Sequence, residues 1–251
     1  MSKVRDLAID ADSILYAVAG QPAKDSLDGE TLEVKPDMKA LKRKFSSLVK
    51  EIEDEVAVAT ISKKFKLGET ILVFSDPTGN FRYDLYPDYK KNRRGMKKSE
   101  AFYKLREWAI RNNVMVEGCE ADDVVCWYAR NGAVSASADK DCLNTKGRWF
   151  DMYHSRRTYE KVKRKRADHF VLLQTLAGDS TDNIKGIPRV GMKTAENLLI
   201  SNGDSWEGVV QSYINAGLTV EDAILNRRLV DMTQYTGERI ELWLPQNIYT
   251  V

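Results

Sequence analysis

Carboxylate side chains follow the ends of several expected strands. The apolar runs at 7–10, 70–74, 114–118 and 133–137 predict four short strands, and each is followed by acids. These acids are Asp10 and Asp12, Asp76, Glu120, Asp122 and Asp123, and Asp139 and Asp141. Because parallel strands deliver their carboxyl ends to one edge of a sheet, we expect the acids to meet there. Asp179 and Asp182, spaced i and i+3 on an expected helix face, can join them.

Such a cluster requires a counter-charge. Carboxylates at close range raise one another's pKa and destabilise a fold. Only oxygen ligands are present, with no histidine or cysteine spaced to join them, and this set favours Mg²⁺, with Mn²⁺ able to substitute. Two such ions about 4 Å apart are suited to phosphoester hydrolysis. Each acid taken alone is equally well explained as a turn residue or helix cap, so the prediction rests on their recurrence.

Basic residues are concentrated although the net charge is only +2. The segment YKKNRRGMKK, residues 89–98, has no acid and contains Lys90, Lys91, Arg93, Arg94, Lys97 and Lys98. Residues 155–166 hold seven Lys or Arg and one Glu. Concentrated cations beside an acidic metal centre favour a polyanionic substrate. Phe81, Tyr86 and Tyr89 flank the first segment and are able to stack on bases, although solvated loops with aromatic anchors explain both segments as well.

The segment GIPRVGMKTA, residues 186–195, has the form of a helix-hairpin-helix turn. Glycines permit the tight turn, and the amides at the start of the next helix hold phosphate oxygens. A plain helix boundary is the alternative. The residues expected to contact a phosphate backbone are Gly186, Ile187, Pro188, Val190, Gly191, Lys193 and Thr194.

The order of elements predicts an α/β fold. Expected strands alternate with helices at 37–59, 99–112 and 121–131, which indicates a central, mostly parallel sheet with helices on both faces. Two short strands around a turn are expected within 147–162, and the pattern is helical from about 167 onward. No apolar run reaches the ~18 residues of a membrane span, and the N-terminus lacks a signal-peptide pattern. Three cysteines without CxxC spacing predict reduced thiols in a cytoplasm.

The chain resembles the 5′-nuclease superfamily, which includes flap endonucleases and the 5′→3′ exonucleases of phages. The resemblance rests on IDAD (9–12), FSD (74–76), YPDYKKNRR (86–94), EADD (120–123), SADKD (137–141) and GDSTDNIKGIPRVGMKTA (178–195). It implies a PIN-like nuclease domain over 1–166, with a basic arch region at about 86–113. It also implies a helical DNA-binding domain over 167–251 with the helix-hairpin-helix (H3TH).

The resemblance also implies roles for individual residues. The first metal cluster would comprise Asp10, Asp76, Glu120, Asp122 and Asp123, and the second Asp139, Asp141, Asp179 and Asp182. Lys90 would contact the scissile phosphate, and Arg93 would be a second catalytic basic residue of the arch. Asp76 and Asp123 would also be catalytic, and Tyr89 would stack near the terminal nucleotides. K⁺ would bind the hairpin. Asp12 has no assigned role.

The implied activity is two-metal, Mg²⁺-dependent hydrolysis of DNA from or near 5′ ends, in phage replication, primer removal or recombination. The substrates would be duplexes with a 5′ end, flap or single-strand junction, with RNA–DNA hybrids also open. An inactive structure-selective DNA-binding protein and a PIN-type ribonuclease are the alternatives.

Overall fold

The computed structural model describes residues 3–20, 36–95, 98–152 and 157–245. A six-stranded sheet in the order β3-β2-β1-β4-β5-β6 forms its centre, and only β6 runs antiparallel to its neighbour. The strands are β1 (Lys3–Asp10), β2 (Phe65–Phe74), β3 (Val114–Met115), β4 (Val134–Ser137), β5 (Gly147–Asp151) and β6 (Tyr159–Val162). The predicted mostly parallel sheet and the strand pair within 147–162 are confirmed.

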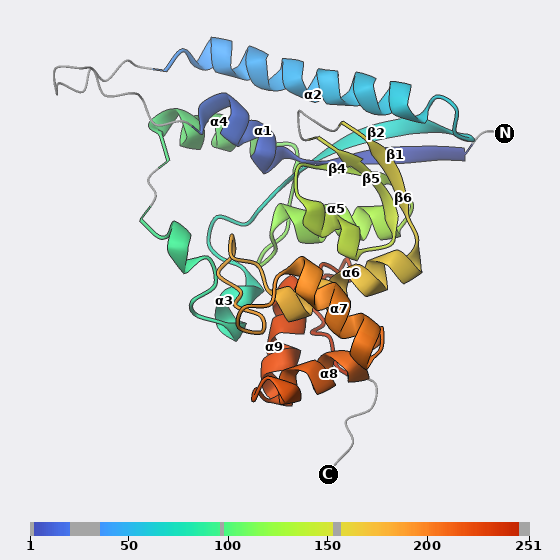
Figure 1. The fold of residues 1–251 in the computed structure, drawn as a ribbon. Helices are drawn as coiled ribbons and strands as arrows, with labels where there is room; N and C mark the ends of the chain where they lie inside the picture. The colour runs from blue at the N-terminus through green and yellow to red at the C-terminus, as the bar shows by residue number, and fades with distance from the viewer. Residues whose placement is uncertain (1–2, 21–35, 96–97, 153–156, 246–251) are drawn as a thin grey trace.

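Helices cover both faces of the sheet (Figure 1). One face packs on α1 (Ala11–Ala19), α2 (Met38–Thr60) and α4 (Glu100–Ile110), and the other on α5 (Ala121–Arg130). Alternation along the strands explains the two layers, since Leu7 and Ile9 of β1 join the first core and Ala8 joins the second. Ser99 caps α4 through a hydrogen bond from the Phe102 amide, as its position before an apolar helix indicates.

A second group of helices lies below the sheet (Figure 1). It contains α6 (Arg164–Ala177), α7 (Met192–Asn202), α8 (Trp206–Asn215) and α9 (Val220–Val230), while α3 (Phe81–Leu85) lies beside it. These helices enclose a core of their own around Leu176, Leu199, Val209 and Tyr213. No helix of the described ranges is long and apolar enough to cross a membrane.

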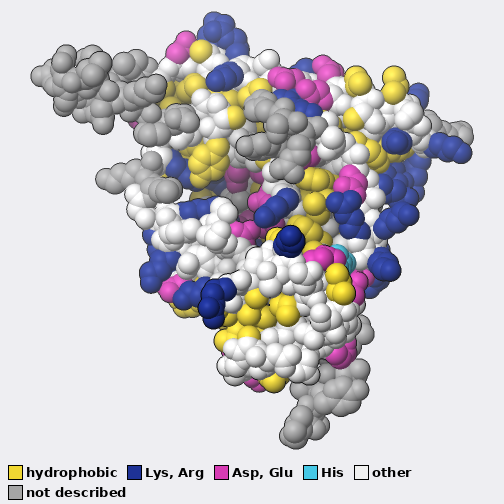
Figure 2. Space-filling view, viewed as in Figure 1, with side chains coloured by type: hydrophobic (Ala, Val, Ile, Leu, Met, Phe, Trp, Pro, Cys, Tyr) yellow, Lys and Arg dark blue, Asp and Glu magenta, His cyan; other side chains and the backbone are white. Residues whose placement is uncertain are grey.

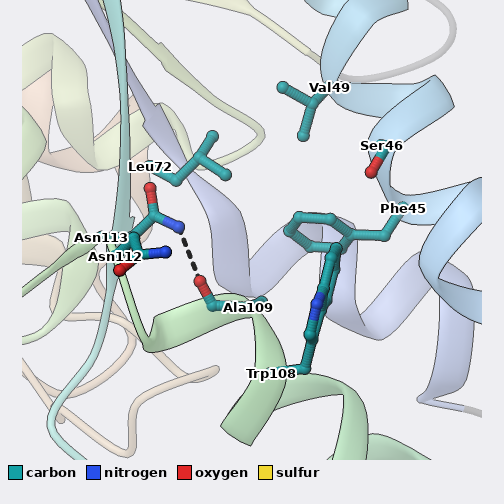
Figure 3. A pocket seen from close by; sticks show the side chains of 8 residues that line it. All are labelled: Phe45, Ser46, Val49, Leu72, Trp108, Ala109, Asn112 and Asn113. Carbon is teal, nitrogen blue, oxygen red and sulfur yellow. Dashed lines mark hydrogen bonds between the residues drawn. The ribbon is translucent and has the colours of Figure 1, made fainter.

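A pocket of about 230 Å³ opens between α2, α4 and β2, next to the crossed rings of Phe45 and Trp108 (Figure 3). Its lining is apolar apart from Ser46, Asn112 and Asn113 and contains no acidic side chain. The pocket therefore takes no part in the acidic cluster at the carboxyl edge of the sheet.

Candidate active site

The Ser137 hydroxyl lies between Asp10 and Asp122 and brings these two acids together. Asp10 ends β1 and caps α1, and it accepts hydrogen bonds from the Ser13 hydroxyl at 2.7 Å and the Asp12 amide at 3.1 Å. Ser137, the last residue of β4, lies 3.3 Å from Asp10 and 3.1 Å from Asp122 of α5. The carboxyl ends of two adjacent strands and the start of a helix therefore meet at one point.

A second set of acids adjoins the first. Asp139 and Asp141 follow β4, and the charges of Asp179 and Asp182 both act on Asp139. Asp179 and Asp182 do not share a helix face, contrary to the i, i+3 prediction. They lie on a turn closed by pairing of Asp179 with Ile184, in which Asp179 accepts from the Thr181 amide and Asn183 has a left-handed φ of 59°. Side-chain capping of the turn competes with helix formation there.

The basic loop docks directly on this acidic turn. The Lys90 amide donates to the Asp182 carbonyl at 2.9 Å, and the Asn92 side chain donates to the carbonyls of 180 and 181. The Lys90 ammonium pairs with Glu120 and lies 3.4 Å from Asp182, which also accepts from Arg93 at 2.8 Å. Lys90 and Arg93, the two basic residues predicted to be catalytic, therefore lie beside the acids Glu120 and Asp182.

Burial sets the ionisation of the acids. Burial and then the charge of Asp12 raise the pKa of Asp10 to about 7, and burial with Asp139 and Asp179 raises that of Asp141 to about 7. Burial also raises the pKa of Asp122 well above its usual range, with Asp10 and Asp139 adding to the effect. Glu120 differs, because Lys90 and Arg82 overcome burial and lower its pKa. Asp10, Asp122 and Asp141 therefore hold protons more tightly than free carboxylates do, and a divalent cation would displace those protons.

The donor set fits divalent metal ions. Buried carboxylates with raised pKa values and no ion pair gain most from a hard cation. In the described part of the chain, however, no three such side chains already close on a single point. The oxygens instead accept from Ser13, Ser137 and Lys90. The metal-ligand assignments remain predictions.

Stability should respond to pH through these acids. Their folded pKa lies near 7 against about 4 when unfolded, so the protons they keep stabilise the metal-free fold at low pH. That stabilisation is lost as pH rises through about 7. We expect the increase in Tm on adding Mg²⁺ to be larger by about 4 °C or more at pH 8 than at pH 5.5, measured by thermal unfolding against EDTA. An increase independent of pH would contradict the linkage.

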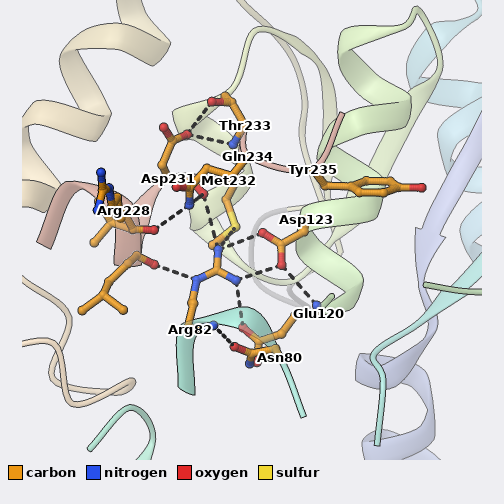
Figure 4. A network of polar contacts seen from close by, with 12 residues as sticks. Asn80, Arg82, Glu120, Asp123, Arg228, Asp231, Met232, Thr233, Gln234 and Tyr235 are labelled. Atoms are coloured by element: carbon orange, nitrogen blue, oxygen red, sulfur yellow. Dashed lines mark hydrogen bonds and ion pairs between the residues drawn. The ribbon is translucent and has the colours of Figure 1, made fainter. Parts of the chain in front are cut away.

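Asp123 is a correction to the predicted ligand set. Both of its oxygens accept from the Arg82 guanidinium at 2.8 Å, and one also accepts from the Glu120 amide (Figure 4). Arg82 further donates to the Leu229 carbonyl, and both side chains are fully buried. Asp123 therefore joins α3, α5 and the end of α9, and its fully buried carboxylate faces Arg82 and not the acids around Ser137.

Asp76 lies apart from the other acids in its contacts. Its oxygens accept from Thr78 and from the Gly118 amide, and Arg106 is the charged residue that acts on it. Burial opposes the shift, but these hydrogen bonds lower the pKa of Asp76. Its metal and catalytic roles stay predictions that require its side chain to leave Thr78.

Tyr89 is a second correction. Its side chain is 1% exposed, so the ring is unavailable for stacking on a nucleotide. The hydroxyl instead lies within hydrogen-bond distance of both Glu120 at 2.7 Å and Asp182 at 2.8 Å, and so links an acid of the first predicted metal cluster to one of the second. Of the other loop residues, Lys91 and Arg93 are partly exposed, and Arg94 donates to the Pro87 carbonyl. Lys98 lies over the rings of Tyr16 and Phe102, and Lys97 falls outside the described residues.

The hairpin has the predicted turn and a partly buried interior. Gly186 has a φ of 59° and lies so close to the end of α6 that a side chain would meet backbone atoms at 2.4 Å. Ile187 packs in the helical core and its amide donates to Leu176, which corrects its assignment as a contact residue. Pro188, Gly191, Lys193 and Thr194 are exposed, Val190 is half-buried, and Gly191 caps α7.

Sequence reasoning missed the neutral residues that hold the acids. Ser13 and Ser137 donate to Asp10, and Gln174 of α6 donates to Asp141. The Ser75 amide donates to Asp12, which places Asp12 at the same edge beside Asp10. Serines directly after a strand or one helical turn beyond an acid were the available signal.

Comparisons with known proteins find similar sequences and a similar fold, although no protein-family model matches. A 5′-3′ exonuclease of Buchnera aphidicola subsp. Acyrthosiphon pisum is 31% identical over 162 residues, covering 57% of this chain and 56% of that protein. The exodeoxyribonuclease of Enterobacteria phage T3 is 31% identical over 200 residues, covering 73% and 64%. The D15 flap endonuclease of bacteriophage T5, solved with DNA and metal ions, superposes with a TM-score of 0.63 at 18% identity, covering 92% and 90%.

The resemblance to the 5′-nuclease superfamily is thereby confirmed. The chain is similar in sequence to exonucleases and shares its fold with a flap endonuclease. It spans about half the length of the 5′-3′ exonucleases that it matches.

Proposed function

We propose that this protein is a divalent-metal-dependent 5′ nuclease that hydrolyses DNA phosphodiesters from or near 5′ ends. The observation that carries the proposal is the convergence, beside Lys90, of carboxylates from β1, α5 and the segment after β4. Of these, Asp10 and Asp141 are buried and Asp122 is half-buried, with no ion pair to these three among the described residues. An unpaired buried acid cluster destabilises a protein that only binds DNA, so its presence favours catalysis. The relatives' names point to the same reaction.

Two Mg²⁺ ions would be held by the acids, one nearer Asp10, Asp122 and Glu120 and the other nearer Asp139, Asp141, Asp179 and Asp182. When bound, they supply Lewis-acid stabilisation of the phosphoryl and leaving oxygens. Lys90 and Arg93 bring positive charge to the same edge. Hydrolysis adds the oxygen of water to phosphorus and breaks the bond to the 3′ oxygen, so the product carries a 5′-phosphate.

The helical group would hold the duplex. We assign residues 1–166 to a nuclease domain and 167–251 to a DNA-binding domain, because α6 to α9 enclose a separate core. The exposed amides at the start of α7, with Lys193 and Thr194, suit phosphate oxygens. We also propose K⁺ on the hairpin carbonyls, where Gly186 and Arg189 have left-handed φ values. The free, buried cysteines support a reducing cytoplasm as the place of action. The proposed role there is in phage replication, primer removal or recombination.

Digestion of 5′-labelled substrates tests the proposal. We expect Mg²⁺ or Mn²⁺ to support release of short 5′-labelled products from duplexes and flaps, with none released in EDTA. Binding without cleavage in either metal would establish the inactive DNA-binding alternative. Cleavage of RNA but not DNA, in side-by-side digestion that includes RNA–DNA hybrids, would establish the ribonuclease.

Lys90→Met should separate catalysis from folding. Its ammonium lies between Glu120 and Asp182, which outweigh burial and raise its pKa, so it stays charged at the acid edge. We expect cleavage to fall by about 100-fold in single-turnover assays, as for loss of one charge-stabilising donor. Lys50→Met, at an exposed lysine of α2 that pairs with acids of its own helix, is the matched control and should change the rate less than about threefold. Equal losses in both variants would remove Lys90 from the proposed site.

A further inference from the structure

A cationic cluster occupies the end of the sheet opposite the acids. Arg5 of β1 and Arg148 of β5 both lie over the Phe65 ring, with guanidinium carbons 5.5 and 5.6 Å from its centroid. Lys63 lies 5.7 Å from the centre of the Tyr159 ring, and Lys161 of β6 is directly opposite Arg148. We call Lys3, Arg5, Lys63, Arg148 and Lys161 the sheet-end cluster.

The cluster lacks counter-charges. Among the described residues, no acid forms an ion pair with any of its members. Arg148 and Lys161 are like charges at a cross-strand position, which destabilises a sheet. Burial and then the charge of Arg148 lower the pKa of Arg5, and the Arg5 Nε is buried without a hydrogen-bond partner. An anion at the surface would relieve the repulsion between these like charges.

The surrounding surface continues the positive charge. Lys and Arg side chains gather along the right-hand edge of the molecule, over the ends of β1 and β2, over β6 and over the beginning of α6 (Figure 2). Lys163 and Lys165 at the start of α6 are exposed and have no ion pair among the described residues. Since α6 leads to the hairpin, the charged strip joins the sheet end to the helical group.

We propose that the sheet-end cluster binds the phosphate backbone of a duplex arm of the DNA substrate, at a distance from the cleavage site. This rests on the proposed nuclease function. The two guanidinium groups lie near the Phe65 ring and leave it unsuited to stack on a base, and Arg5 also donates to the Gly132 carbonyl. The ammonium groups of Lys3, Lys63 and Lys161 are exposed and suited to phosphate oxygens. The chemistry therefore favours phosphates over bases, and a duplex over a single strand.

The length of the sheet sets the reach. Lys3 lies seven residues before Asp10 along β1, about 23 Å, which corresponds to about seven base pairs of duplex, and Lys63 lies just before Phe65, the residue paired with Lys3. An arm shorter than this cannot reach from the acids to the cluster. The proposal therefore predicts a dependence on arm length that a general charge effect does not produce.

The test uses the double variant Lys3→Glu/Lys63→Glu, whose exposed lysines lie at the end of the sheet farthest from Asp10. Each duplex arm of the junction is lengthened in turn, and binding is measured in Ca²⁺ at about 0.1 M salt. For an arm of 18 base pairs, we expect the variant to bind about fivefold or more weakly than the unaltered protein. For an arm of 6 base pairs, we expect the affinity to fall less than about twofold. The log-log salt slope should fall by about one to two for the long arm only. Lys39→Glu/Lys44→Glu on α2, exposed and free of ion pairs in the described structure, is the charge-matched control.

Equal loss for both arm lengths, or the same loss in the control, would overturn the proposal. Equal loss on a single-stranded extension of the same length would overturn the assignment to a duplex. Cleavage by the unaltered protein is measured on the same junctions. If it cleaves none of them, the nuclease function fails, while the length dependence of binding is still read separately.

Discussion

Replacing Asp122 by asparagine is expected to lower cleavage by about 10³-fold and to raise the stability of the metal-free protein. Asp122 lies beside Ser137, and the charges of both Asp10 and Asp139 act on it. Its amide keeps an oxygen for Ser137 but removes a repelling charge. A metal ion loses a ligand at the same time, worth several kcal/mol of charge stabilisation in the transition state.

The measurements are single-turnover cleavage in Mg²⁺ and urea unfolding in EDTA at pH 8. Asp84→Asn is the matched control, since Asp84 is exposed on α3, and both quantities should stay nearly unchanged. If Asp122→Asn lowered stability together with cleavage, the loss of activity would reflect misfolding. Unchanged cleavage would remove Asp122 from the site.

Arg82→Met is expected to lower the free energy of unfolding by about 3–5 kcal/mol, the largest stability effect we predict. The substitution removes the bidentate partner of Asp123 and leaves a fully buried carboxylate without a cation. It also removes the donor to the Leu229 carbonyl, which connects α3 to the end of α9. Denaturant unfolding measures the change.

Removing both partners should restore part of this stability. In Arg82→Met/Asp123→Leu no charge is left buried, so we expect a smaller loss than in the single variant. Lys104→Ala, which breaks an exposed pair with Glu100 on α4, should cost about 1 kcal/mol or less. A double variant as unstable as Arg82→Met would show that Asp123 contributes through its other contact, the Glu120 amide.

The carboxyl edge of the sheet followed from local sequence patterns. Apolar runs ending in acids specify parallel strands, and parallel strands place Asp10, Asp122 and Asp139 at one edge without knowledge of side-chain contacts. The hairpin also followed, because Gly186 and Pro188 restrict the backbone locally.

Long-range pairing was not readable from the sequence. EADD presents equivalent-looking acids, yet Asp122 faces the cluster while Asp123, one residue on, points into the interior toward Arg82. The partner of a buried charge depends on packing between segments distant in the chain. Tyr89 and Ile187 were assigned to the surface for the same reason, since their burial comes from contacts with α9 and with the helical core.

Anomalous scattering from Mn²⁺ in crystals of the protein tests the central claim most directly. We predict two Mn²⁺ peaks about 4 Å apart. One should lie among the carboxylates of Asp10, Asp122 and Glu120, and the other among those of Asp139, Asp141, Asp179 and Asp182. Peaks elsewhere on the surface, with these carboxylates bonded only to protein groups at saturating Mn²⁺, would contradict the proposed active site.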